Sequence, residues 1–233
     1  MRRARANDAR CERADSEGTV LVGRAVKLQF DPTNFVSAIN NRYNPLTPET
    51  TFQYRSETPD GVETSEFHVT RNTKRILGVN ATVVHDQVFL DGELTEDTFD
   101  WFAQNRQGNV WYLGDDSKAL ENGHVVSTEG SWEAGVKVAK AGIVLLADPK
   151  PGLAYRQEFA VGVAEDNARV LSLRASVNVP YGNFGGCLQT LEKTPLARGA
   201  TEHKFYCRGI GLVLTVEPKG GPIQDELTSI THF

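Results

Sequence analysis

Hydrophobic and polar residues alternate with a period of two over most of the chain. The alternation is clear over 50–55, 66–90 and 97–113, and it returns over 155–180 and 201–216. Val, Thr, Phe and Ile, which favour strands, are frequent in these segments. Residues outside them show no sustained helical spacing, except for the short stretch NFVSAINN. The pattern predicts an all-β, antiparallel fold with little helix.

Short turn sequences separate the predicted strands. TPDG at 58–61 is typical of a β-turn that ends in Gly. LDGE at 90–93 and the pair Asn122–Gly123 are typical of tight hairpins. NRQGN at 105–109 lies in the middle of another hairpin, over residues 97–116. Strands joined so closely predict either an antiparallel barrel or two clasped half-sheets.

The two halves of the chain resemble each other weakly. Tyr54–Arg55 corresponds to Tyr155–Arg156, and the hairpin around Trp101 corresponds to residues 204–213. This similarity indicates an internal duplication, with halves over about 43–130 and 151–227 and a connection over 131–150. A barrel or sandwich built from such halves has a mouth or a cleft where small molecules commonly bind.

Length and charge narrow the classes of function. The chain has 233 residues, of which 39% are hydrophobic, and its net charge is −5. We therefore expect a single β domain over residues 18–233. The first residues are rich in arginine, so the rest of the chain is more acidic than the total suggests. This acidic body argues against nucleic acid as a partner, because nucleic-acid binding needs a basic face.

Residues 1–17 are predicted to be a disordered basic tail. A secretory signal needs an apolar stretch behind its basic residues, and here Asp15, Glu17, Arg24 and Lys27 interrupt the following segment. The chain also has no apolar run of about 18 residues that would predict a membrane span. We expect a cytoplasmic protein with no membrane partner, with a homodimer as one possible assembly.

Three cysteines, Cys11, Cys187 and Cys207, form an odd and sparse set without a CxxC motif. Cys187 and Cys207 could lie on neighbouring strands and pair in an exported protein. In a reducing cytoplasm we expect them to be small buried residues instead. The five histidines lack the HExxH and HxH spacings. The sequence therefore predicts neither a metal nor a cofactor.

The hairpin over 97–116 carries aromatic residues on both faces. Trp101 shares one face with Phe99, whereas Phe102 lies on the other, and Tyr112 follows on the second strand. A hairpin with one wet face would not carry bulky aromatics on both sides. Core packing on both faces is one explanation. Our functional interpretation is that one face, with Trp101 or Tyr112, lines a hydrophobic substrate pocket.

The segment EGSWEAG holds Glu129 and Glu133 on either side of Trp132. Residues four apart on an extended strand share a face, so these carboxylates could act as acid and base or bind a cation. A dry site beside Trp132 would also raise a carboxyl pKa. The alternative is a solvated loop. Calcium-loop and glycosidase signatures are absent from the sequence.

Two Tyr–Arg pairs, Tyr54–Arg55 and Tyr155–Arg156, would occupy equivalent places in related halves. Tyr and Arg side chains can bind an oxyanion such as an enolate or a carboxylate. The alternative is that each arginine pairs with a nearby acid, Glu57 or Glu158. The glycine-rich segments near residues 181–187 and 208–212 do not lie between a strand and a helix, so they do not predict a nucleotide site.

Four segments resemble a widespread bacterial family of β-rich proteins. They are YNPLTPETTFQYRSETPDG, DTFDWFAQNRQGNVWYLGDD, STEGSWEAG and EHKFYCRGIGLVLTVEPKGG, and the resemblance covers residues 43–227. The corresponding family patterns read YxPLxPGTTxxY, DTYDWYAQDxxGNVWYxGED, EGSWEAG and YYAPGVGLV. The chain departs from them in having GDD at 114–116 and CRGIG at 207–211. Many members look exported, and the lack of a signal here implies an intracellular role.

The chain has a looser resemblance to polyether and tetronate polyketide cyclases. That resemblance implies an enzyme that folds an apolar linear polyketide in a hydrophobic cavity for [4+2] or related ring closure, without a metal. Such a reaction needs a shaped cavity and a group that polarises a carbonyl. The candidate residues are Tyr54, Glu133 and Arg156 for catalysis, and Trp101, Tyr112, Trp132 and Tyr155 for substrate binding.

Two other functions stay open at this point. One is a non-catalytic module that binds a hydrophobic ligand such as a lipid or a peptide. The other is an acid–base hydrolase that uses Glu129 and Glu133.

Overall fold

The computed structural model describes residues 24–197, 199–218 and 223–233. Within these ranges the single helical element is the short 3-10 helix η1 (Pro32–Asn34). The all-β prediction with little helix is confirmed. The stretch NFVSAINN ends η1 and then forms strands β2 (Phe35–Val36) and β3 (Ile39–Asn41). The predicted tail over residues 1–17 lies outside the described residues.

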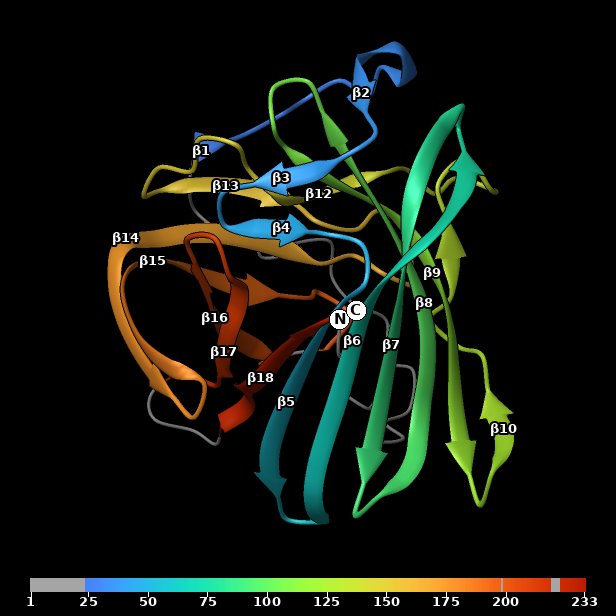
Figure 1. The fold of residues 1–233 in the computed structure, drawn as a ribbon. Helices are drawn as coiled ribbons and strands as arrows, with labels where there is room; N and C mark the ends of the chain where they lie inside the picture. The colour runs from blue at the N-terminus through green and yellow to red at the C-terminus, as the bar shows by residue number, and fades with distance from the viewer. Residues whose placement is uncertain (1–23, 198, 219–222) are drawn as a thin grey trace.

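Two antiparallel meanders form most of the main sheet (Figure 1). The first consists of β5 (Thr50–Thr58), β6 (Gly61–Ile76), β7 (Val79–Leu90), β8 (Glu93–Asn105), β9 (Val110–Glu121) and β10 (His124–Ser127). The second consists of β13 (Leu153–Arg156), β14 (Asn167–Val179), β15 (Gly182–Lys193), β16 (Thr201–Cys207), β17 (Gly211–Val216) and β18 (Ile223–His232). The ladder between β18 and β5 joins the two meanders into one sheet.

The meanders occupy the two predicted halves of the chain. β5 and β13 are the first strands of their meanders, and the hairpins β8–β9 and β16–β17 follow at the same positions in each. These are the segments that the internal similarity pairs, although the duplication itself stays a prediction. The connecting segment contributes β11 (Trp132–Glu133) and β12 (Gly142–Leu145), which both pair with β9.

The sheet curls strongly, but its ladder does not close into a barrel. Its two sides meet beside β12, where the amide of Lys140 donates to the carbonyl of Phe159 at 2.9 Å in an isolated bridge. Gly142 lies so close to this second side that an added Cβ would be 2.0 Å from the carbonyl oxygen of Gln157. The sheet is also not wholly antiparallel, because β1 (Arg24–Ala25) pairs with β13 in parallel.

The predicted hairpin turns are confirmed by their backbone angles. Asp91 and Gly92 have φ of 48° and 86°, and Asn122 and Gly123 have φ of 50° and 75°. Two successive positive φ angles match the right-handed twist of the strands that the turn connects. These dipeptides therefore set the register of β7 with β8 and of β9 with β10.

A short hairpin bridges the two meanders above the interior of the sheet (Figure 1). It consists of β3 and β4 (Asn44–Leu46). β3 contacts β8 of the first meander, and β4 contacts β17 of the second. The carbonyl of Arg42, in the turn of the hairpin, accepts from the amide of Gly209 at 2.8 Å. Both meanders are thus tied to one small element.

Cys187 on β15 and Cys207 on β16 form a disulfide, which corrects the expectation that they are separate reduced residues. The register explains the pairing. Leu188 is the partner of Tyr206 in the antiparallel ladder, so the adjacent Cys187 and Cys207 lie opposite each other. The Cα atoms of the two cysteines are 4.4 Å apart. The two side chains are only 0% and 2% exposed. The disulfide is therefore a buried cross-strand link.

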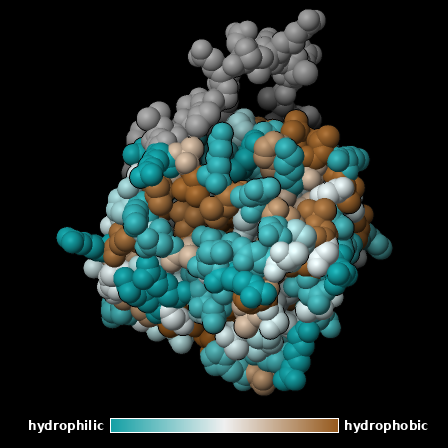
Figure 2. All heavy atoms as spheres, turned by 90° about the horizontal axis from the view of Figure 1, so that it is seen from above, coloured by the Kyte–Doolittle hydropathy of each residue, from teal (hydrophilic) through white to brown (hydrophobic). Residues whose placement is uncertain are grey.

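The surface is mostly hydrophilic when the molecule is seen from above, with smaller hydrophobic patches between the polar side chains (Figure 2). In the part of the chain that the structure describes, no helix has the length and apolar character needed to span a bilayer.

Candidate functional site

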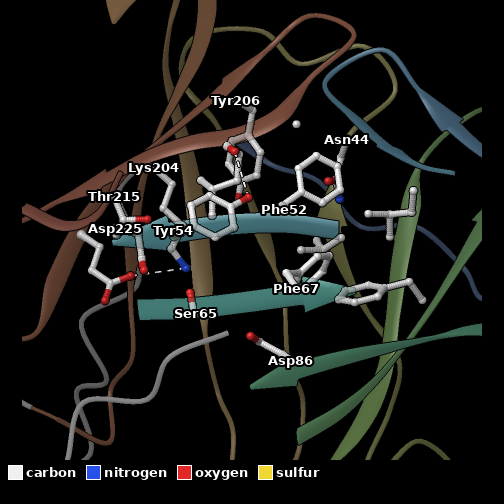
Figure 3. A pocket seen from close by; sticks show the side chains of 16 residues that line it. Asn44, Phe52, Tyr54, Ser65, Phe67, Asp86, Lys204, Tyr206, Thr215 and Asp225 are labelled. Carbon is white, nitrogen blue, oxygen red and sulfur yellow. Dashed lines mark hydrogen bonds and ion pairs between the residues drawn. The ribbon is translucent and has the colours of Figure 1, made fainter. Parts of the chain in front are cut away.

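A cavity of about 100 Å³ lies inside the curled sheet (Figure 3). Both meanders and the β3–β4 hairpin contribute side chains to it. One part of the lining is apolar and consists of Leu46, Phe52, Phe67, Phe102, Val144 and Leu212. The other part is polar and consists of Asn44, Tyr54, Ser65, Asp86, Glu202, Lys204, Tyr206, Thr215 and Asp225. We call this cavity and its lining the interior pocket.

Strand periodicity explains why these residues meet. Side chains two positions apart on a strand point to the same face. Tyr54 therefore points inward with Phe52 on β5, and Tyr206 points inward with Lys204 on β16 (Figure 3). β5 and β16 belong to different meanders, and the curl of the sheet brings their inner faces together.

Lys204 is the buried cation of the pocket, with 7% of its surface exposed. Its Nζ lies 3.2 Å from a carboxylate oxygen of Glu192 and 3.3 Å from one of Glu202. Desolvation by burial lowers the pKa of Lys204, but the Coulombic attraction of Glu192 and Glu202 outweighs it, so the pKa lies well above its ordinary value. The amine is thus a permanent ammonium. It can donate hydrogen bonds, but it cannot act as a nucleophile at neutral pH.

Glu192 lies behind Lys204 and is held by donors. The hydroxyl of Thr190 donates to its carboxylate at 2.8 Å, and the hydroxyl of Tyr206 does so at 3.4 Å. Burial raises the pKa of Tyr206, and the charge of Glu192 raises it further. Tyr206 therefore stays a neutral donor. The network fixes the position of the ammonium at the wall of the pocket.

Tyr54 lines the pocket, as one of the predicted site residues. Its hydroxyl donates to the carbonyl of Leu212 at 3.0 Å. Burial raises the pKa of Tyr54, and the charges of Asp225 and Asp86 raise it further. The phenol is therefore neutral, and its single proton is used within the protein. Its oxygen keeps lone pairs, so Tyr54 offers a ligand an acceptor rather than the predicted carbonyl-polarising donor.

Thr215 is a pocket residue that the sequence did not single out. It is 1% exposed, and its Oγ1 has no hydrogen-bond partner among the residues that the structure describes. A buried hydroxyl without a partner costs about 1–3 kcal/mol. A polar group of a bound molecule would remove that cost.

Tyr112 lies in the interior next to the pocket lining. Its ring stacks on Phe102 with a centroid distance of 4.9 Å and meets the ring of Trp132 edge-on at 5.5 Å. Its hydroxyl donates to Asp100 and lies 3.0 Å from Asp115. Tyr112 and Trp132 therefore support the aromatic wall from behind, whereas Phe102 forms its surface.

The other face of the 97–116 hairpin is covered as well. Lys74 lies over the ring of Trp101, with its Nζ 3.3 Å from the ring centroid, and it forms an ion pair with Glu133 at 2.8 Å. Trp111 packs against the rings of Phe30 and Phe35. The prediction of two covered faces is confirmed. Trp101 and Glu133 do not belong to the lining of the interior pocket.

Glu129 does not form an acid–base pair with Glu133. Glu129 is exposed and lies in a turn, where its amide donates to the hydroxyl of Ser127 at 3.0 Å. The prediction assumed one extended strand through both residues, and that assumption is wrong. The solvated-loop alternative describes Glu129, and the ion pair with Lys74 accounts for Glu133.

The two predicted Tyr–Arg pairs divide between the inside and the outside. Tyr155 is buried, and its pKa is raised by burial and by Glu192 and lowered by Lys204, which places its phenol near the charged network. Arg156 forms an ion pair with Glu165 at 2.9 Å, an acid that the alternative interpretation did not name. Arg55 forms an ion pair with Glu57 at 2.9 Å, as the alternative interpretation predicted. Neither arginine lines the pocket.

In the described ranges, no group of three or more His, Cys, Asp or Glu side chains could hold a metal ion. Comparison with known proteins adds no assignment, because no family model, no curated protein and no solved structure matches the chain. The resemblances inferred from the four sequence segments therefore stay predictions.

Proposed function

We propose that this protein binds a small amphiphilic molecule in the interior pocket. The observation that carries the proposal is the division of one cavity into an aromatic wall and a buried charged network around Lys204. Ligand sites are typically apolar cavities with a few fixed polar groups that orient the ligand. The phenylalanines would bind the apolar body of the molecule, and the polar residues would bind its head group.

The size of the cavity indicates the size of the ligand. Its volume is about 100 Å³, which is smaller than the apolar cavity of about 150 Å³ that accommodates benzene in another protein. The cavity would therefore enclose most of a single ring or a short branched chain, with the rest at its open side. A long linear polyketide is a poorer match. This comparison favours the binding module over the cyclase.

Binding of a neutral probe tests the proposal directly. We expect benzyl alcohol to shift the NMR signals of pocket residues in a saturable manner. Ser65→Met should abolish these shifts, because Ser65 lines the cavity and a longer side chain would fill it. The matched control is Thr64→Met, since Thr64 is exposed on the opposite face of the same strand. Shifts that survive Ser65→Met, or that vanish equally in both variants, would place binding elsewhere.

Ring closure of a polyketide is a second candidate function. It is favoured by the ammonium of Lys204, a fixed donor beside an aromatic wall, because such a donor stabilises developing charge on a carbonyl oxygen. The test is incubation with a linear polyene tetronate, followed by mass spectrometry for an isomeric product of unchanged mass. A new isomer that Ser65→Met abolishes and Thr64→Met preserves would support catalysis in the pocket. Absence of an isomer would exclude that substrate.

A further inference from the structure

We propose that the ligand of the interior pocket is an organic cation, with a protonated amine on a small apolar body. This inference rests on the proposed function, and it names the chemical class of the head group. Three features of the pocket carry it: an excess of carboxylate charge, several acceptor atoms in the lining and an aromatic wall.

The charged network has one more negative charge than positive charge. The single ammonium of Lys204 lies between the two carboxylates of Glu192 and Glu202. Glu192 also accepts hydrogen bonds from the hydroxyls of Thr190 and Tyr206, so its carboxylate already has partners within the protein. Glu202 contacts Lys204 through Oε2 and borders the cavity. Unlike Glu192, its carboxylate is therefore placed where a ligand that donates can reach it.

Further acceptors line the same cavity. The phenol of Tyr54 uses its proton on Leu212, so its oxygen can only accept from a ligand. The hydroxyl of Thr215 is buried in the lining and, among described residues, finds no partner. Asp86 and Asp225 also line the cavity and place negative charge near Tyr54. An ammonium has three donors and no acceptor, which fits such a set.

The aromatic wall suits the carbon atoms next to a charged nitrogen. Phe67 lies between Phe52 and Phe102, with ring centroid distances of 6.2 and 6.3 Å. A cation within about 6 Å of a ring face is attracted by the ring's quadrupole. The wall therefore contributes to the binding of a cation and adds nothing comparable for an anion.

An anionic ligand is the main competitor, because Lys204 could bind it. An anion that binds the ammonium would lie beside the carboxylates of Glu192 and Glu202 and would approach Asp225 in the lining. Like charges in a poorly solvated site repel strongly. A cation, by contrast, can bind to Glu202 while Glu192 keeps Lys204 neutralised.

Three probes of similar size separate these possibilities: benzylamine, benzyl alcohol and benzoate. At neutral pH, we expect benzylammonium to bind at least about tenfold more tightly than benzyl alcohol, and benzoate to bind most weakly. Dissociation constants can be measured by NMR titration of the full chain. Glu202→Gln should reduce the preference for the amine, whereas Glu57→Gln, on the outer face beside Arg55, should leave it unchanged.

Thr215→Val provides a second variant that leaves all charges in place. It should weaken binding of benzylamine more than binding of benzyl alcohol, provided that its circular dichroism matches that of the parent. Equal or tighter binding of benzyl alcohol, or tightest binding of benzoate, would overturn the cation inference and leave the proposed function intact. Failure of all three probes to bind would overturn both.

Discussion

In the interior, a buried carboxylate is paired with a buried phenol. Asp100 is fully buried at 0% exposure, and the hydroxyl of Tyr112 donates to it. Burial raises the pKa of Tyr112, and the charges of Asp100 and Asp115 raise it further. The phenol therefore keeps its proton and remains a donor. In this arrangement one hydroxyl stabilises a negative charge that solvent does not reach.

Removal of that hydroxyl should be costly. Tyr112→Phe would leave Asp100 without the donor, and a hydrogen bond to a charged group contributes about 1.5–3 kcal/mol. We expect the free energy of unfolding in urea to fall by about that amount. Tyr181→Phe is the matched control, because Tyr181 is 40% exposed. Equal stability of the two variants would show that the hydroxyl does not stabilise Asp100.

The position of Gly114 has no room for a side chain. Its φ is +126°, and an added Cβ would lie 2.1 Å from the carbonyl oxygen of Trp132. Gly114→Ala should therefore destabilise the protein by about 1–2 kcal/mol from the conformational strain, and the close contact with Trp132 should add to this loss. Gly185→Ala, where nothing lies within 4 Å of the added Cβ, should change the melting temperature little. A similar effect of both substitutions would contradict the close approach of β11 to β9.

At the scale of secondary-structure elements, the disulfide links two strands of the second meander. β16 carries Lys204 and Tyr206 just before Cys207, so the link holds the pocket wall against β15. Disulfides persist in oxidising compartments and are rare in the cytosol. The expected cytoplasmic location stays a prediction. The redox state of Cys187 and Cys207 in the cell would test it.

We expect the disulfide to be present in protein produced under oxidising conditions. Alkylation of the denatured chain should then label one thiol, and alkylation after reduction should label all three cysteines of the sequence. Closing a loop over a sequence separation of 20 corresponds to about 3 kcal/mol of stability. Reduction should lower the free energy of unfolding by a similar amount, and Cys11→Ser should not. Labelling of three thiols before reduction would exclude the link.

The sequence predicts these elements well, because strands and tight turns depend on local chemistry. Period-two alternation identified the strands, and Asp91–Gly92 predicted its turn, since such dipeptides favour positive φ angles. The pocket depends instead on which distant strands face each other. Thr215 and Lys204 share a cavity with Tyr54 only through the joining of the two meanders. Alternation reveals which residues share a face of one strand, and says nothing of what lies opposite.

For the whole molecule, the four buried phenols contribute to a loss of stability at alkaline pH. Burial raises the pKa of Tyr54, Tyr112, Tyr155 and Tyr206 well above the ordinary value. Above about pH 10 the unfolded chain loses these protons and the folded protein retains them. The stabilisation is therefore complete below that pH and is lost as the pH rises toward the folded-state pKa values. Each such phenol contributes a slope of about 1.4 kcal/mol per pH unit.

Tyr155→Phe tests this dependence with little structural cost. The hydroxyl of Tyr155 finds no hydrogen-bond partner in the described part of the chain. The variant should thus be nearly as stable as the parent at neutral pH, and its stability should fall less steeply above about pH 10. Unfolding in urea at several alkaline pH values measures both quantities. An unchanged slope would mean that this phenol also ionises in the folded protein.

The position of β18 has a consequence for how the protein is made. This strand lies between β17 and β5, and it follows every other described strand in chain order. A ribosome therefore synthesises the first meander and the other strands of the second before it delivers β18, the strand that unites them. Until then two neighbouring edges stay open, and open edges pair readily with foreign strands. During this interval a chaperone that covers the open edges of β5 and β17 would favour folding over aggregation.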